Sequence, residues 1–193
     1  MLLFVVRHGE TEGNVKKLYY SQTDMPLTDK GRQQALALRP FLSQFTFDRV
    51  YSSDLSRALE TAQLMLPGCQ PIQSPLLREY KMGWIDGMTH AEVWEKFGYI
   101  NEHYEQFGGE SPQDMCARLQ TFLDGLVADP CDRALVFGHA GTMKGLLSVV
   151  LGEAANTQNV LSINCNIAVF RYVDNRWILA AWNLAGNLEG DMT

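Results

Sequence analysis

The chain has 193 residues, of which 46% are hydrophobic and 20% are charged, and its formal net charge at pH 7 is -6. A chain of this length and composition can bury one hydrophobic core, so we expect a single domain over residues 1–193. The net negative charge argues against nucleic acid and anionic membranes as main partners, because both require a positively charged surface on the protein. A small anionic substrate remains compatible with it, since a few arginines can converge in one pocket.

The first apolar run, from Leu2 to Val6, is too short for a signal peptide or a membrane span and has the length of a buried strand. The four cysteines are widely spaced and form no C-x-x-C pair, so we interpret them as reduced, structural residues. They are Cys69, Cys116, Cys131 and Cys165. Together these features favour a cytoplasmic protein.

The first half of the chain alternates between predicted strands and helices. After the strand over 2–6, a helix is expected to begin at the capping residue Thr28, and Pro40 within it predicts a kink or a break. A second strand is predicted over 47–51 and a second helix over 55–66.

The middle of the chain, residues 75–111, is irregular and rich in glycine and aromatic residues, and we expect His90 and His103 to lie on its surface. Beyond it the pattern predicts a helix over 115–126, a strand over 134–137 and a helix over 142–151. Two apolar runs, 167–172 and 177–182, flank Asp174-Asn175 and predict a tight hairpin.

This alternation indicates an α/β fold: a three-layer sandwich with a mostly parallel central sheet, helices on both faces, and an antiparallel edge added by the hairpin. Arg7-His8 and Gly138-His139 both follow the carboxyl ends of predicted parallel strands. Open α/β sheets bind ligands at that edge. We therefore expect the two histidines to face one crevice.

Residues 7–14 (RHGETEGN) surround His8 with groups suited to a phosphate ligand. Arg7 supplies a fixed cation with a planar donor fork, Gly9 lets the backbone pass close to a ligand, and Asn14 adds a neutral donor. A lone histidine is usually a hydrogen-bonded core residue, but these neighbours favour a functional role for His8.

Arg57, within residues 52–62 (SSDLSRALETA), is expected in the first turn of a helix at the same edge. A cation there opposes the helix dipole unless an anion lies nearby; the alternative is a capped helix with a surface arginine. His139, within residues 137–142 (FGHAGT), can donate to a phosphate oxygen, and the backbone amides that follow it, beginning with Ala140, point the same way.

Glu79, within residues 77–79 (LRE), has two interpretations. A loop glutamate is normally solvated, and composition alone favours that role. The alternative is a general acid whose pKa is raised by a partly apolar site.

In this order, residues 7–14, 52–62, 77–79 and 138–141 resemble the motifs of the histidine phosphatase superfamily, which has the phosphoglycerate mutase-like fold. The similarity covers nearly the whole chain, including residues 26–31 and 109–111. A single motif is weakly specific, whereas four at these separations are specific. The resemblance thus implies the same fold and a phosphatase activity.

The resemblance also assigns roles to individual residues. It implies that His8 is the nucleophile and phosphoryl carrier and that Glu79 is the proton donor. The expected contacts to the phosphate and the rest of the substrate come from a set of residues at the pocket: Arg7, Asn14, Ser21, Arg57, His139 and Ala140.

These roles agree with the chemistry of phosphoryl transfer, which needs in-line positioning and neutralisation of the equatorial oxygens. Two arginines and a protonated histidine can neutralise that charge, so we expect neither a metal nor a cofactor. Neighbouring cations favour the neutral, nucleophilic form of His8. Glu79 would first protonate the leaving alkoxide and then deprotonate the water that hydrolyses the labile phosphohistidine.

The short middle, and the absence from residues 18–24 of the tryptophan that mutases carry there, favour hydrolysis over mutation. The compact length, segment 47–50 and the spacing from Glu79 to Gly83-Trp84 resemble bacterial α-ribazole-5'-phosphate phosphatases of cobalamin assembly. We expect Tyr20 and Trp84 to line the leaving-group side.

The predicted substrate is therefore a small phosphorylated metabolite, first of all α-ribazole 5'-phosphate. The alternatives are a fructose-2,6-bisphosphatase-like or broad-specificity sugar phosphatase, a phosphoglycerate mutase, and a catalytically inactive phosphate-binding regulatory module. We expect no nucleic acid or membrane partner, and the sequence allows a homodimer.

Overall fold

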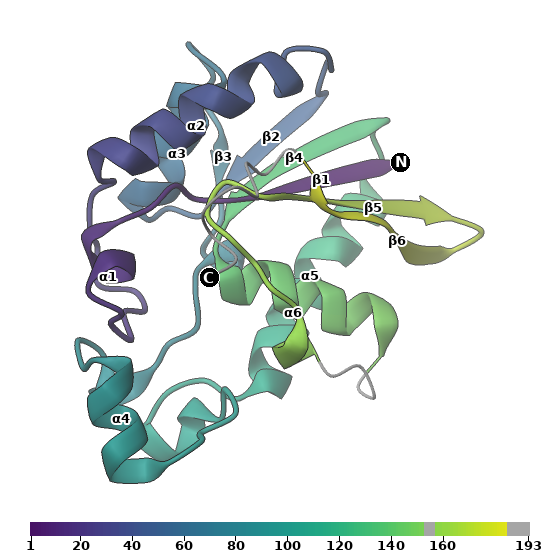
Figure 1. Cartoon of the computed structure of the whole chain (residues 1–193). Helices are drawn as coiled ribbons and strands as arrows, with labels where there is room; N and C mark the ends of the chain where they lie inside the picture. Colours follow the sequence, from purple (N-terminus) through teal and green to yellow (C-terminus); the bar gives the residue numbers. More distant parts are fainter. Residues whose placement is uncertain (153–156, 185–193) are drawn as a thin grey trace.

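The computed structural model describes residues 1–152 and 157–184, in which a six-stranded sheet lies between two layers of helices (Figure 1). The strands are β1 (Leu2–Arg7), β2 (Arg49–Ser52), β3 (Ile72–Gln73), β4 (Arg133–Gly138), β5 (Ile167–Val173) and β6 (Arg176–Leu184). The α-helices are α1 (Glu12–Val15), α2 (Asp29–Leu42), α3 (Ser56–Met65), α4 (His90–Phe97), α5 (Pro112–Ala128) and α6 (Ala140–Leu151). Short 3-10 helices form η1 (Pro75–Leu77), η2 (Gly83–Ile85), η3 (Tyr104–Phe107) and η4 (Thr157–Asn159).

The strand order is β3-β2-β4-β1-β5-β6, which confirms the predicted α/β sandwich. β1, β2, β3 and β4 run parallel to their neighbours in this group, whereas β5 is antiparallel to both β1 and β6. The β5–β6 turn places Asp174 and Asn175 at φ values of 49° and 57°. Two consecutive left-handed residues are what a tight two-residue hairpin requires.

Successive residues of β1 enter opposite halves of the core. Leu3 and Val5 belong to the cluster built with α5 and α6, whereas Phe4 and Val6 belong to the cluster built with α2 and α3. Figure 1 shows these helix pairs on the two faces of the sheet. Because side chains alternate along a strand, a strand covered on both faces must be apolar throughout, which explains the unbroken run at the N-terminus.

α2 begins as predicted, with the Thr28 hydroxyl accepting a hydrogen bond from Gly31 N at 3.0 Å. Of the kink or break predicted at Pro40, the break was wrong, since the helix continues to Leu42. Pro40 removes only its own N–H, whose acceptor would be the carbonyl of Leu36 in the preceding turn. The Leu36 side chain is 43% exposed, so water can reach that part of the helix.

The sequence did not predict β3, which lies just before the irregular middle of the chain, or α4, which lies within it. α4 is capped by a reciprocal pair in which Glu92 N donates to the Thr89 hydroxyl (3.1 Å) and Thr89 N donates to Glu92 Oε2 (2.7 Å). The spacing of a threonine three residues before a glutamate is a helix-start signal that was available in the sequence. All four cysteines are free, and no helix in 1–152 or 157–184 is long and apolar enough to cross a membrane.

The loop after β1 lies in direct backbone contact with the start of α2. Thr28 N donates to the Glu10 carbonyl at 2.9 Å. A Cβ placed on Gly31 would lie 2.1 Å from the same carbonyl oxygen, and a Cβ on Gly9 would lie 2.5 Å from the Gly31 carbonyl oxygen. Glycine at these positions therefore allows the two segments to approach each other beside His8.

We expect Gly31→Ala to lower the free energy of unfolding by about 1–3 kcal/mol, the usual cost of forcing atoms into a packed site. Gly125→Ala is the matched control, because Gly125 lies within α5 and a Cβ there meets nothing within 4 Å. That change should raise stability by about 0.5–1 kcal/mol through helix propensity. Urea denaturation followed by circular dichroism measures both, and equal midpoints for the two variants would contradict the backbone contact.

Candidate active site

His8 lies directly after β1 and is only 2% exposed. Its Nδ1 is 2.7 Å from the Gly9 carbonyl oxygen. A carbonyl only accepts, so Nδ1 must carry the proton, and Nε2 of the neutral ring keeps its lone pair. Burial holds the pKa of His8 well below its ordinary value of 6.5, and the charges of Arg57 and Arg7 lower that pKa further. The ring is therefore neutral, with Nε2 able to act as a nucleophile.

His139, at the start of α6, is fully buried beside His8, with 5.2 Å between the ring centroids. The backbone sets this position, because His8 N donates to the Gly138 carbonyl at 3.0 Å. Burial lowers the pKa of His139 well below 6.5, and the cationic charge of Arg57 acts in the same direction. Neither ring nitrogen has a hydrogen-bond partner among the described residues. The predicted meeting of the two histidines is confirmed.

Arg57 lies in the first turn of α3 with its side chain 0% exposed. It donates to the carbonyl oxygens of Ser21 (Nη2, 2.7 Å) and Thr23 (Nη1, 3.2 Å), and its guanidinium carbon lies 4.9 Å from the centre of the Tyr20 ring. Its Nε is buried without a partner in the described part of the chain. The surface-arginine interpretation was therefore wrong, since the guanidinium is held inside the site.

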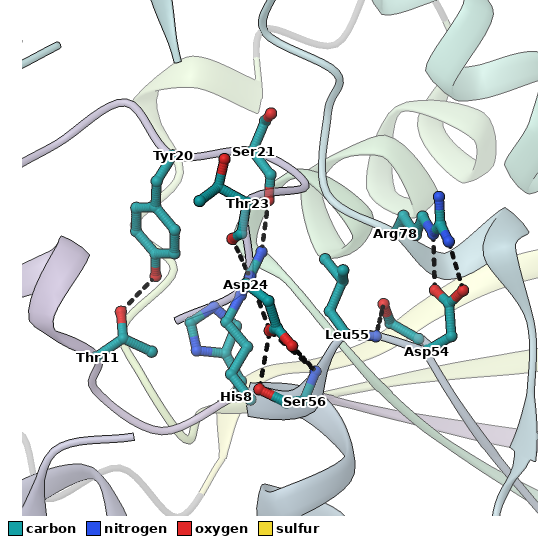
Figure 2. A network of polar contacts seen from close by, with 12 residues as sticks. His8, Thr11, Tyr20, Ser21, Thr23, Asp24, Asp54, Leu55, Ser56 and Arg78 are labelled. Carbon is teal, nitrogen blue, oxygen red and sulfur yellow. Dashed lines mark hydrogen bonds and ion pairs between the residues drawn. The ribbon is translucent and has the colours of Figure 1, made fainter. Parts of the chain in front are cut away.

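The anion expected at the start of α3 comes from the protein itself. The Asp24 carboxylate accepts hydrogen bonds from Ser56 N (3.0 and 3.2 Å) and from the Ser56 hydroxyl (2.8 Å), as Figure 2 shows. Asp24 is 4.0 Å from Arg57 Nη1, beyond hydrogen-bond distance. The helix dipole is thus offset without any ligand, and Arg57 keeps its unpaired Nε.

Asn14 is held by a network that the sequence did not reveal. Its Oδ1 accepts hydrogen bonds from Thr11 N (3.1 Å), the Tyr20 hydroxyl (3.1 Å) and Asn164 Nδ2 (3.2 Å). Asn164 also donates to the His8 carbonyl at 3.0 Å. With the amide oxygen engaged, the amide nitrogen of Asn14 is the group that can donate to a ligand. Nothing near Asn164 in the sequence marks it as part of the site.

Glu79 is 8% exposed, so the solvated interpretation of this residue was wrong. Its Oε1 accepts a hydrogen bond from Tyr80 N (2.8 Å) and its Oε2 accepts one from Gly141 N (3.1 Å). A Cβ on Gly141 would lie 2.0 Å from Oε1. The absence of a side chain at Gly141 therefore allows the carboxylate to reach the start of α6.

Ser21 has a different place from the one expected. Its hydroxyl donates to Asp86 Oδ2 (2.8 Å), its backbone N donates to Asp86 Oδ1 (3.0 Å), and its carbonyl holds Arg57. Figure 2 shows Ser21 beside Tyr20 and Thr23. Trp84 is 61% exposed and packs against Phe97 with 5.5 Å between ring centroids. Neither Ser21 nor Trp84 belongs to the cavity wall formed by the described residues.

A cavity of about 720 Å³ opens at His8. Five of the predicted site residues share its wall with His8: Arg7, Asn14, Arg57, Glu79 and Ala140. The rest of the wall is aromatic and charged, and includes Tyr19, Tyr20, Trp94, Tyr99, Tyr104, Lys17, Glu102 and Lys144.

His90 also belongs to this wall, with its ring centroid 4.6 Å from that of Tyr19. The expectation that it is a surface residue is confirmed. The residue is exposed to solvent, but α4, which the sequence did not predict, places it at the cavity. Burial of its ring lowers the pKa of His90.

The chain belongs to the histidine phosphatase superfamily, since the family model for branch 1 matches residues 3–185. A protein of Enterobacter sp. (strain 638) named probable phosphoglycerate mutase GpmB is 32% identical over 200 residues, covering 97% of this chain and 93% of that one. A solved mycobacterial glucosyl-3-phosphoglycerate phosphatase in complex with VO3 has a TM-score of 0.85 at 28% identity, covering 94% of this chain and 98% of its own. The α-ribazole phosphatase of Shigella flexneri has a TM-score of 0.80 at 26% identity, covering 95% and 96%.

Family membership and these phosphatase structures identify the chain as a phosphoric monoester hydrolase that acts on small phosphorylated substrates. In residues 1–152 and 157–184 no group of three or more His, Cys, Asp or Glu side chains is placed to hold a metal ion.

The two buried neutral histidines predict a pH-dependent stability. Because the pKa values of His8 and His139 are lowered in the folded protein, the unfolded chain binds more protons as pH falls below 6.5. Stability should therefore be fully present above 6.5 and decrease below it. Each of His8→Asn and His139→Asn should reduce the slope of unfolding free energy against pH by up to about 1.4 kcal/mol per unit. Urea denaturation between pH 5 and 7 tests this, and slopes equal to that of the unmodified protein would contradict it.

Proposed function

We propose that the protein hydrolyses phosphomonoesters through a phosphohistidine formed on Nε2 of His8. The proposal is based mainly on the protonation and hydrogen bonding of the side chains at the end of β1. A neutral His8 lies beside two buried groups without protein partners among the described residues, Arg57 Nε and the His139 ring. Unpaired buried donors cost free energy, and a phosphate oxygen would satisfy them.

In the first step, Nε2 of His8 forms a bond to phosphorus while the bond to the leaving oxygen breaks. Arg7, Arg57 and Asn14 line the cavity at this point and would hold the equatorial oxygens. Glu79 gives a proton to the leaving oxygen. In the second step, water attacks phosphorus, the bond from Nε2 to phosphorus breaks, and the Glu79 carboxylate takes the proton from water. The positive charge comes from side chains, so the reaction as proposed uses no metal.

For the substrate, we favour α-ribazole 5'-phosphate, whose leaving group carries an aromatic base. The cavity wall supports this choice through Tyr19, Trp94, Tyr99 and Tyr104, which offer faces and edges for an aromatic ring. The likeness to the α-ribazole phosphatase structure agrees with it.

Phosphoglycerate is the second candidate, because the curated relatives are named as phosphoglycerate mutases. Such a substrate brings a carboxylate that needs a cation in the cavity. Lys144 is one such cation, but its Nζ is paired with Glu102 Oε1 at 3.2 Å. Both side chains are largely shielded from solvent, at 19% and 23% exposed. A substrate carboxylate that pairs with Lys144 would have to displace Glu102, which favours an uncharged leaving group on that side of the cavity.

The test of the function is trapping of the intermediate. We expect rapid quench of the wild type with a phosphorylated substrate to give acid-labile, base-stable phosphate on the protein, and His8→Ala to abolish both label and turnover. His103→Ala is the matched control, since His103 is a half-exposed histidine that pairs with Glu105 at 2.8 Å. A chelator should leave the rate unchanged. Substantial turnover by His8→Ala would rule the mechanism out.

The substrate preference is tested at Glu102. Glu102→Gln frees Lys144 to pair with a substrate carboxylate, so kcat/KM for 3-phosphoglycerate should rise about 5-fold relative to α-ribazole 5'-phosphate, the factor expected for about 1 kcal/mol from a partly exposed ion pair. Lys144→Met should shift the ratio the opposite way. If 3-phosphoglycerate is already the better substrate of the wild type, the proposed substrate is wrong while the phosphatase chemistry stands.

A further inference from the structure

The Gly109-Glu110-Ser111 segment is part of the family resemblance, yet it has no place in the mechanism above. The structure connects it to Glu79 through one side chain, Arg118. Ser111 caps α5, with Asp114 N donating to its hydroxyl at 3.1 Å, and Arg118 lies further along that helix.

Arg118 binds the backbone that carries Glu79. Its Nη1 donates to the Leu76 carbonyl (2.5 Å), and its Nη2 donates to the carbonyls of Arg78 (2.8 Å) and Glu79 (3.3 Å). The side chain is only 16% exposed. One planar guanidinium thus holds three carbonyl oxygens of a segment that belongs to no strand of the sheet.

Glu110 fixes the guanidinium in turn. Its Oε1 accepts from Arg118 Nε at 2.6 Å and its Oε2 accepts from Nη2 at 3.1 Å, with the Glu110 side chain 14% exposed. Glu110 is also tied to the residues after Glu79, because its backbone N donates to the Lys81 carbonyl at 2.7 Å and Lys81 N donates to its Oε2 at 3.3 Å. The pair therefore contacts the chain on both sides of Glu79.

We propose that Arg118, oriented by Glu110, is a positioning residue that holds the Glu79 carboxylate at the leaving oxygen. This role rests on the proposed function, in which Glu79 is the general acid. Removal of the guanidinium would leave the carbonyls of Leu76 and Glu79 without their side-chain donor. The Arg78 carbonyl would keep only the Thr142 hydroxyl at 3.4 Å, and the segment would move to recover hydrogen bonds. The carboxylate would then shift away from the site, although Tyr80 N and Gly141 N still offer their protons.

Comparing substrates with different leaving groups can detect such a shift of the Glu79 carboxylate. An alkyl phosphate needs a proton on the departing oxygen, whereas a nitrophenyl phosphate does not. We expect Arg118→Met to lower kcat/KM for an alkyl phosphate by about 10- to 100-fold, the effect of a misplaced catalytic group, and for nitrophenyl phosphate by under about 3-fold. Arg118→Lys should recover only part of the loss, because an ammonium lacks the planar fork. Glu110→Gln should give a smaller loss of the same selectivity.

Arg39→Met is the matched control. Arg39, on α2, also binds a backbone carbonyl, donating from Nε (2.9 Å) and Nη2 (2.6 Å) to Leu64 O in α3. Its loss should lower thermal stability and leave the ratio of the two kcat/KM values unchanged. If Arg118→Met, Arg118→Lys and Glu110→Gln change both substrates by one factor, as Arg39→Met would, the positioning role is wrong. Circular dichroism shows which variants fold. If Arg118→Met does not fold, Arg118→Lys and Glu110→Gln still decide the test.

Glu79→Gln separates this proposal from the mechanism on which it rests. It should show the same selective loss for the alkyl phosphate, and Arg118→Met added to it should cause no further selective loss. If Glu79→Gln is selective and the Arg118 variants are not, only the positioning role fails. If Glu79→Gln shows no selective loss, the acid role fails, and the positioning role fails with it whatever the Arg118 variants do.

Discussion

The burial of Arg57 without a hydrogen-bonded carboxylate is the constraint on which the site depends. Taking a guanidinium out of water costs several kcal/mol, and the carbonyls of Ser21 and Thr23 offset only part of that cost. Asp24 remains 4.0 Å away and is engaged at the start of α3 by Ser56. A carboxylate bound directly to Arg57 would neutralise it and remove its attraction for phosphate. Burial lowers the pKa of both histidines and the charge of Arg57 lowers it further, so the charge that would attract a phosphate also favours the neutral form of His8.

Backbone amides hold the carboxylate of Glu79, the proposed general acid, in its position. Both carboxylate oxygens of Glu79 accept from backbone amides, and one of those amides belongs to the first turn of α6, where the positive end of the helix dipole attracts a carboxylate. Gly141 leaves the room that this approach needs. Because the carboxylate of Glu79 is held by backbone amides, its position changes when the backbone moves. Contacts that hold the 76–81 backbone therefore affect the position of this carboxylate without touching it.

The parts of the fold and site that the sequence predicted are those set by local pattern. An apolar run buried on both faces marked β1 and β4, and the residues at their ends marked His8 and His139. The capping residue Thr28 correctly predicted the start of α2. Pro40 interrupts the helical pattern of the sequence, but the helix accommodates it in its last turn. The errors come from contacts between distant residues. Nothing local shows that Asp24 would occupy the start of α3, that Ser21 would turn its hydroxyl to Asp86, or that Arg118 would reach the carbonyl of Glu79. The place of His90 at the cavity was not predicted, because α4 lies in a segment without strong periodicity.

The cavity wall also divides into residues held at the sheet and residues outside it. The proposed phosphate end of the cavity includes Arg7 and His8 at the end of β1 and Arg57 in the first turn of α3, which the sheet and the helix packed on it hold in place. The other end is built from residues 17–20 and 90–104, which belong to short helices and loops outside the sheet (Figure 1). Changes there alter the leaving-group wall without disturbing the core, so one phosphoryl-transfer site is compatible with relatives named for glucosyl-3-phosphoglycerate, α-ribazole and phosphoglycerate. In the proposed function, substrate choice depends on how Glu102, Lys144 and the aromatic wall meet the leaving group, and phosphoryl transfer depends on the buried charge of Arg57.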